Sequence, residues 1–235
     1  MSAHAATLVC HSHGKPTPAA QWNDGFDLSK SAETVIALSS IIQFPRNAEV
    51  FGEDEPADYV YVVLSGVVRI CKLLGDGRRQ IETFCLAGDA FGWETGDRNR
   101  FSAEAVSECR LARIKRSILF ARASDDPELS QAMWLLTMAE LHRAQEHLLL
   151  LGRKTAHERV ATFLIDLARR SCRAGANANE VTLAMSRQDI ADYLGLTIET
   201  VSRTLTSLEE SALISLVSSR RIVLKDRCGL RRLDA

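Results

Sequence analysis

The stretch from Ser186 to Leu208 constrains the fold most, because it carries the start and stop signals of two short helices. Ser186 and Asp189 have the S-x-x-D spacing of a capping box, which predicts that a helix begins there. Gly195 tolerates the positive φ that ends a helix in a sharp turn, and Thr197 is a hydroxyl N-cap for a second helix. Two helices joined by a glycine-containing turn within about 22 residues predict a helix-turn-helix.

The second of these helices, expected from residue 198 to about 207, has one polar face and one apolar face. Its inward-facing residues are Val201, Leu205 and Leu208, and those of the first helix are Ile190, Ala191 and Leu194. Glu199, Ser202 and Arg203 are spaced i, i+3 and i+4, so they share the opposite face. Arginine can donate two hydrogen bonds to guanine, glutamate can accept from cytosine, and a serine hydroxyl can do either. In a helix-turn-helix this face enters the major groove, so we predict that these three side chains read DNA bases.

Four further polar residues lie near the two helix starts. Ser186, Arg187, Gln188 and Thr200 supply donors where backbone amides and the helix dipole favour phosphate, so we expect them to contact the DNA backbone. The alternative for Glu199 and Arg203 is an ordinary i, i+4 ion pair on a solvated helix, worth only about 0.3 to 0.5 kcal/mol.

The charge distribution agrees with a nucleic-acid partner for the C-terminal part. The net charge of the chain is only -1, yet residues from 153 onward hold 14 Lys and Arg against 10 Asp and Glu. The first 152 residues hold 15 against 20. A DNA-binding protein needs basicity on one face only, so the near-neutral total does not argue against this function.

Upstream, the sequence changes to short apolar runs separated by turn residues. The runs span residues 59–64, 67–74, 81–86 and 103–114, and they predict an antiparallel barrel or sandwich of short strands. Gly75-Asp76-Gly77 is a good hairpin turn, because glycine and aspartate tolerate positive φ. Residues 29–40 are expected to form a short helix, and the preceding residues a loosely held arm.

Beyond Pro127 the pattern becomes helical. Residues 129–151 carry a broad apolar stripe, and Gly152 is placed to end the helix. The stripe has to be covered by the barrel or by a second copy of the chain, and the pattern leaves both open. The residues expected in a homodimer interface are Trp134, Met138, Leu141 and Leu148. A second helix, a strand at 181–183 and a hairpin ending at 223–225 complete a winged helix-turn-helix.

Composition sets broader limits. No apolar stretch approaches the roughly 20 residues that span a bilayer, and the N-terminus lacks a signal-peptide pattern, so a cytoplasmic protein is expected. The six cysteines form no C-x-x-C pair, and we expect no disulfide framework. The sequence contains no GxxxxGK[ST], GxSxG, HExxH or GxGxxG, so no familiar catalytic motif supports an enzyme.

The stretch from Arg187 to Arg203 closely resembles Crp/Fnr transcription regulators, and residues 151–160 match the junction after the dimerisation helix of that family. The E-x-x-S-R arrangement at Glu199 to Arg203 resembles the FixK-like branch. The resemblance implies an α+β chain: a flexible arm (1–28), a cyclic-nucleotide-binding-like β-roll (29–126), a dimerisation helix (127–152) and a winged helix-turn-helix (153–235). It also implies a homodimeric activator with double-stranded DNA and RNA polymerase as partners, bound at a TTGA-type inverted repeat.

A sensor fold does not by itself establish what is sensed. Cyclic-AMP-binding relatives resemble one another in a Gly-Glu and an Arg-Ser pair, where this chain has Gly92-Trp93 and Phe101-Ser102. Oxygen-sensing relatives resemble one another in four cluster cysteines, where this chain offers Cys109 and, in the arm, only Cys10. The sequence therefore predicts no cofactor, no metal and no bound effector. The resemblance to the FixK-like branch implies a regulator of microaerobic respiration, denitrification or nitrogen fixation.

The alternative is a regulator of the same family gated by haem with nitric oxide, an iron-sulfur cluster or a small molecule. A haem would need an axial donor, and His142 and His147 lie on the long helix.

Overall fold

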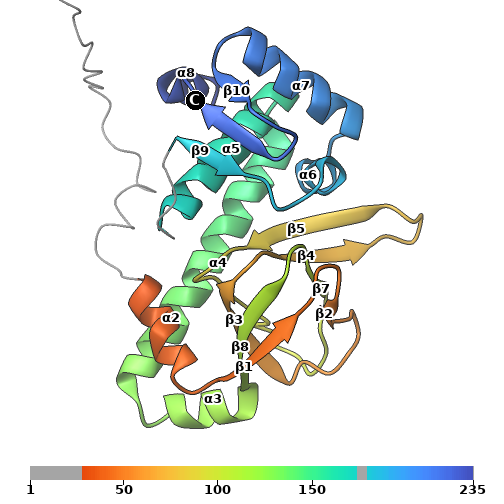
Figure 1. The fold of residues 1–235 in the computed structure, drawn as a ribbon. Coiled ribbons are helices and arrows are strands. Elements are labelled where there is room, and N and C mark those ends of the chain that lie inside the picture. Colours follow the sequence, from red (N-terminus) through yellow and green to blue (C-terminus); the bar gives the residue numbers. More distant parts are fainter. Residues whose placement is uncertain (1–27, 174–178, 235) are drawn as a thin grey trace, which may run out of the picture.

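The computed structural model describes residues 28–173 and 179–234. The predicted arm lies outside the described residues except for Leu28, where helix α2 (Leu28–Ile36) begins. This helix is shorter than the predicted 29–40, because Ser40 already belongs to a strand. Figure 1 shows a strand-rich N-terminal domain, a long helix α4 beside it and a smaller helical domain at the C-terminus.

The N-terminal domain is a roll of two four-stranded antiparallel sheets. One sheet has the order β1-β8-β3-β6 and the other β2-β7-β4-β5. The strands are β1 (Ser40–Phe44), β2 (Glu49–Phe51), β3 (Tyr59–Ser65), β4 (Val68–Leu73), β5 (Arg79–Cys85), β6 (Ala90–Phe91), β7 (Ser102–Ala105) and β8 (Cys109–Lys115). The predicted strand at 103–114 is in fact two, because the chain turns at residues 106–108 and continues in the other sheet.

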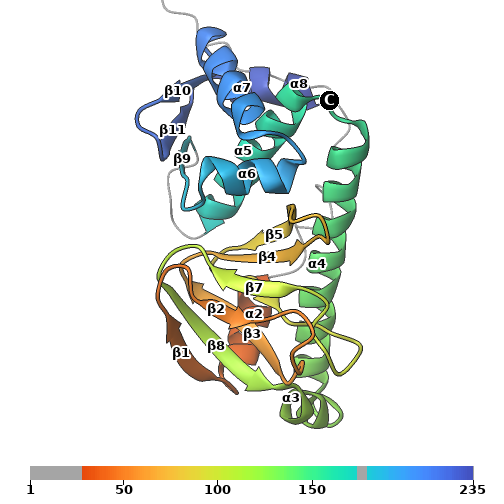
Figure 2. The same cartoon turned by 90° about the vertical axis from the view of Figure 1, so that its right-hand side faces the viewer.

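The β4–β5 hairpin confirms the predicted turn. The Leu74 amide donates to the Arg78 carbonyl at 2.7 Å, and Gly77 has φ 84°, which glycine adopts without strain. In both views of the molecule the hairpin extends from the roll to the underside of the C-terminal domain (Figures 1 and 2).

Helix α4 (Pro127–Arg153) runs along the whole molecule (Figure 2). Its N-cap is Asp126, whose carboxylate accepts from the Leu129 amide at 3.0 Å. The prediction that Gly152 ends the helix is wrong, because the helix continues to Arg153 and Lys154 is the C-cap. Its buried residues are Leu129, Ala132, Leu136 and Leu150. A short helix before it, α3 (Arg116–Ala123), was not predicted, since it has only eight residues and a single buried one.

The C-terminal domain is a winged helix-turn-helix. Its elements are α5 (Ala156–Arg173), β9 (Glu180–Thr182), α6 (Arg187–Leu194), α7 (Ile198–Glu210), β10 (Ile214–Leu216), β11 (Arg221–Leu224) and α8 (Arg227–Asp234). The three strands form one sheet in the order β10-β11-β9. Helix α8 was not predicted, and it covers α5 through the fully buried Leu230. None of the helices in residues 28–173 and 179–234 is long and apolar enough to cross a membrane.

The two domains share one hydrophobic core. Ile81 and Phe84 of β5 belong to the same buried cluster as Leu164 of α5 and Leu194 of α6. The Phe84 ring lies 5.3 Å from the ring of Tyr193, measured between centroids. This shared core holds the C-terminal domain against the roll.

A buried carboxylate adds a polar anchor to this contact. Asp89 of the roll accepts hydrogen bonds from Arg170 of α5 and from the Leu86 amide at 2.7 Å. Arg143 of α4 lies 3.4 Å from the same carboxylate. Burial by itself would raise the pKa of Asp89, but the two arginines and the amide outweigh it, so the pKa lies below its usual value.

We predict that Asp89→Asn lowers the free energy of unfolding by about 3 kcal/mol at neutral pH, because two largely buried arginines lose a shared counter-charge and, among the described residues, only Arg170 keeps a second one, Asp166. The native pKa of Asp89 is below the unfolded value of 3.8, so its contribution is complete above that value and is lost as pH falls through the native pKa. In thermal unfolding at stepped pH, the deficit of the variant should therefore shrink below about pH 4. Asp97→Asn, at an exposed roll carboxylate, is the control. A deficit that stays constant with pH would contradict the assignment.

Candidate DNA-binding site

The capping signals of the helix-turn-helix form as predicted. The Ser186 hydroxyl accepts from the Asp189 amide at 3.0 Å, while the Asp189 carboxylate accepts from the Ser186 amide at 2.9 Å. Gly195 ends α6 in the left-handed conformation, at φ 62° and ψ 40°. The Thr197 hydroxyl accepts from the Thr200 amide at 3.2 Å and so begins α7. These bonds set the angle between the two helices.

Arg159 of α5 fastens the turn to the rest of the chain. Its guanidinium donates to the Leu194 carbonyl at 2.8 Å, the Leu151 carbonyl at 2.9 Å and the Lys154 carbonyl at 2.9 Å. A single side chain thus satisfies carbonyls at the end of α4 and at the end of α6. This role was missed from the sequence, where Arg159 stood only within the junction motif.

The predicted base-reading face of α7 is exposed. Glu199, Ser202 and Arg203 all lie on the solvent side, while Val201 and Leu205 are buried beneath them. The Ser202 hydroxyl donates to the Ile198 carbonyl at 2.9 Å, which leaves its lone pairs able to accept.

The two charged side chains of this face do not neutralise each other. Within the described residues, no ion pair of 4.0 Å or less joins Glu199 to Arg203, so the ion-pair alternative is not formed. The Glu199 backbone amide and the Thr197 hydroxyl lower the pKa of Glu199, and Arg203 has a smaller effect. The carboxylate of Glu199 is therefore charged, and it is not neutralised by an ion pair with Arg203.

The predicted phosphate-contacting residues divide into two groups. Ser186 and Gln188 are exposed, but they donate within α6, to Asp189 at 2.8 Å and to Asp192 at 2.6 Å. Arg187 is half-buried, with one guanidinium nitrogen enclosed and without a hydrogen-bond partner among the described residues. Burial lowers the pKa of Arg187. The structure does not gather these side chains into a single cluster of free donors.

The wing adds a basic residue that the sequence reasoning did not select. Arg220 is exposed at the tip between β10 and β11. Its neighbour Arg221 is instead paired with Glu180 of β9, which also lowers the pKa of that glutamate. The sequence feature that could have identified Arg220 is the Ser-Ser-Arg-Arg run between two short strands, which is typical of a wing tip.

Comparison with known proteins agrees with this geometry. Residues 41–125 match the model of the cyclic nucleotide-binding domain, and residues 158–233 match that of the Crp-like helix-turn-helix domain. The nitrogen fixation regulation protein FixK of Azorhizobium caulinodans is 64% identical over 99% of this chain and 97% of its own length. The FixK of Rhizobium meliloti is 44% identical over 82% of this chain and 86% of its length.

The chain belongs to the Crp/Fnr family of transcription regulators.

Within this family it is FixK-like, as the sequence predicted. The solved structure of FixK2 from Bradyrhizobium japonicum has a TM-score of 0.79 and 48% identity, covering 84% of this chain and 98% of that one. These relatives confirm the roll, the long helix and the winged helix-turn-helix as the family fold. They are named as regulators, which agrees with the prediction that the chain is not an enzyme.

In this Crp/Fnr regulator, aromatic side chains fill part of the roll. The Phe91 ring stacks on Tyr61 at 5.2 Å between centroids and lies 6.1 Å from the ring of Phe51. Phe101 packs against this cluster. Glu94 and Arg100 lie near the substituted positions but bond to each other at 2.8 Å. The charges of Glu94 and Arg100 therefore neutralise each other.

The other sensor candidates differ in their exposure. The thiol of Cys109 is buried and lies 3.2 Å from the Val67 carbonyl, and burial raises its pKa. The His147 ring stacks on Tyr193, and both of its nitrogens are buried without a hydrogen-bond partner in residues 28–173 and 179–234. Burial lowers the pKa of His147 to about 4. His142 is exposed and lies 3.3 Å from Glu146. Cys10 lies outside the described residues.

Proposed function

We propose that this regulator binds an inverted-repeat operator of the TTGA type as a homodimer, with Glu199, Ser202 and Arg203 reading base edges. The observation that carries the proposal is that the three side chains are exposed together on a capped helix, with the two charges unpaired. Ser186, Arg187, Gln188 and Thr200, together with Arg220 of the wing, are proposed to approach the phosphates. Two recognition helices related by a two-fold axis reach successive major grooves about 34 to 36 Å apart.

The proposed dimer interface is the outer face of α4. Trp134 is 64% exposed, Leu141 47% and Leu148 72%, and Met138 lies on the same side. The opposite side of the helix packs against the roll through Leu136 and its neighbours, so the roll does not cover this stripe. Exposed apolar surface of this kind favours a second copy of the chain, since two-fold dimers are the commonest oligomers.

Effector independence is part of the proposal. Phe101 packs in the aromatic cluster, and Glu94 and Arg100 are paired with each other, so neither of these two charged side chains is free to bind a cyclic phosphate. We expect the protein, purified in air, to bind its operator without cyclic AMP and with an affinity that cyclic AMP leaves unchanged. Fluorescence anisotropy with labelled operator measures this. A requirement for cyclic AMP, or for anaerobic handling together with bound iron, would contradict it.

The relatives indicate the physiological role. The most similar relatives described above are named as nitrogen fixation regulation proteins. We propose that this chain activates genes for microaerobic respiration, denitrification or nitrogen fixation, with RNA polymerase as its partner in the cytoplasm. Mapping its binding sites across the genome under low oxygen tests this, and sites that lie away from promoters of such genes would exclude it.

One observation favours an effector-gated alternative. A cavity of about 630 Å³ lies between β5, α4 and α5, and its lining includes Glu82, Glu140, His147 and Tyr193. Burial raises the pKa of Glu140 to about 7. Absorption spectra of protein purified without oxygen distinguish an empty chain from one that holds haem or a cluster.

A further inference from the structure

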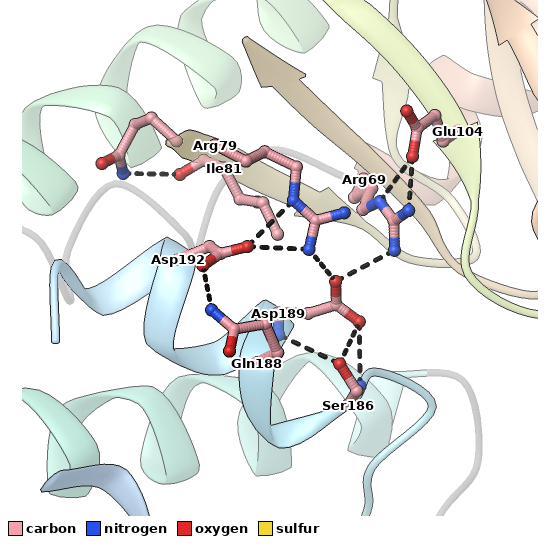
Figure 3. Close-up of polar contacts among 9 residues, drawn as sticks. Arg69, Arg79, Ile81, Glu104, Ser186, Gln188, Asp189 and Asp192 are labelled. Carbon is pink, nitrogen blue, oxygen red and sulfur yellow. Dashed lines mark hydrogen bonds and ion pairs between the residues drawn. The ribbon is translucent and has the colours of Figure 1, made fainter. Parts of the chain in front are cut away.

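The acidic capping residue of α6 has a second set of partners, which lie in the other domain. The Asp189 carboxylate accepts from Arg69 of β4 at 2.9 Å and from Arg79 of β5 at 2.6 Å (Figure 3). Arg79 also donates to Asp192, one turn further along α6, at 2.9 Å. We call these four residues the hairpin clasp. They join side chains that are 110 and more positions apart in the sequence.

The clasp is partly shielded from water and held on both sides. The side chains of Asp189 and Arg69 are 7% and 13% exposed. Glu104 of β7 accepts from the Arg69 Nε at 2.8 Å and so orients its guanidinium towards α6 (Figure 3). Burial by itself would raise the pKa of Asp189, but the bonds from Ser186 and the two arginines lower it, so the acid stays charged. Oriented, partly buried ion pairs resist rotation far better than exposed ones.

The clasp acts on the part of the molecule that approaches DNA. Asp189 is the capping acid of α6, and α6 is joined to the base-reading helix α7 by the three-residue turn 195–197. A displacement of the hairpin would therefore be transmitted to α7 as a rigid movement. The apolar contact of Phe84 with Tyr193 lies beside the clasp, so two kinds of interaction fix the same pair of elements.

We infer that Arg69 and Arg79 of the roll are positioning residues for operator recognition, which hold α6 and α7 in the orientation that matches one half-site spacing. This inference rests on the proposed binding of an inverted repeat by a homodimer. It assigns the β4–β5 hairpin, which is not part of the proposed base-reading face, a role in selecting operators by geometry. Without the clasp, the C-terminal domain should populate several orientations relative to the roll, and only a fraction of these orientations fits the operator.

The test is a spacing series measured with Arg69→Gln/Arg79→Gln. Operators with the central spacer shortened or lengthened by one base pair rotate one half-site by about 35° relative to the other. The natural chain should bind one spacing much more tightly than its neighbours. If about one dimer in ten has both protomers in the correct orientation, the variant should lose about tenfold in affinity for the preferred spacing. The variant should lose less affinity for the operators with a shortened or lengthened spacer, so its preference for one spacing becomes weaker.

The matched control is Arg78→Gln on the same hairpin. Arg78 pairs only with Asp76 in the described residues and is largely exposed, so this variant should behave as the natural chain. Arg79→Lys keeps the charge but cannot bridge both aspartates as a fork. The operator affinity of this variant should lie between that of Arg78→Gln and that of Arg69→Gln/Arg79→Gln. Adding Asp192→Asn to a chain that already carries Arg79→Gln should change the operator affinity little further, because the two residues act as a pair.

The outcomes separate the inference from the function on which it rests. The salt dependence of binding should be unchanged in the clasp variant, because no phosphate contact is lost. Equal losses on all spacings, unchanged binding or tighter binding of the preferred operator would each overturn the positioning role. If the natural chain has no preference for an inverted repeat of fixed spacing, the proposed function itself fails.

Discussion

Arg203→Ala should abolish the preference of the protein for one base pair in each arm of its operator. Arg203 is exposed on α7 and has no ion-pair partner among the described residues, so its guanidinium is free to donate two hydrogen bonds to one guanine. Each such contact contributes about 1 to 3 kcal/mol, and a two-fold dimer makes it twice, so the loss should reach about 2 to 6 kcal/mol. Binding to operators substituted at every position of one arm measures this.

Loss of a backbone contact has a different signature, which provides the comparison. Arg220→Ala, at the exposed tip of the wing, and Arg187→Ala, at the start of α6, should weaken binding to all sequences alike and reduce its salt dependence. The two experiments together separate base reading from attraction to phosphate. If Arg203→Ala weakens every operator equally and leaves base preferences intact, the recognition face has been assigned wrongly.

Leu141→Glu with Leu148→Glu should convert the protein to a monomer that no longer binds its operator. Both side chains are exposed on the outer face of α4, and in a dimer each would place a carboxylate in an apolar seam. The variant should also bind the full operator no better than a half-site, because the two recognition helices are no longer joined. Light scattering gives the mass, and anisotropy gives the affinity.

The control places the same charges elsewhere. Ile41→Glu with Ile118→Glu changes two apolar side chains that are 57% and 50% exposed, on β1 and α3. This variant should remain a dimer and bind normally. A dimer that survives the changes at Leu141 and Leu148 would place the interface on another surface, and a monomer with full operator affinity would show that dimerisation is not needed.

The helix-turn-helix could be derived from the sequence because its signals are local. Ser186, Asp189 and Thr197 cap helices through bonds that span three residues, and these bonds are present as expected. The alternation of buried and exposed positions on α7 follows from helical periodicity, which is why the exposed trio was found. A helix end without such a bond was placed less accurately, because α4 ends at Arg153, one residue beyond the predicted Gly152.

Other features depended on which surfaces the fold brings together. A helix of only eight residues such as α8 is marginal in water by itself, and it is stabilised by packing on α5. The replacement at Phe101 could be read from the sequence, but its packing in an aromatic cluster could not. Arg159 stands in a recognisable motif, yet its carbonyl partners come from the ends of two different helices, α4 and α6.

Asp189 shows most clearly which features follow from the sequence and which depend on the tertiary structure. The sequence by itself determined that this acid caps α6, because the capping bond depends only on residues three positions apart. Only the tertiary structure decided that the same carboxylate also binds Arg69 and Arg79, since no local pattern specifies which surface of the roll faces α6. Local hydrogen bonding starts the DNA-reading helices, whereas their orientation relative to the roll depends on the shared core and on ion pairs between residues far apart in the chain.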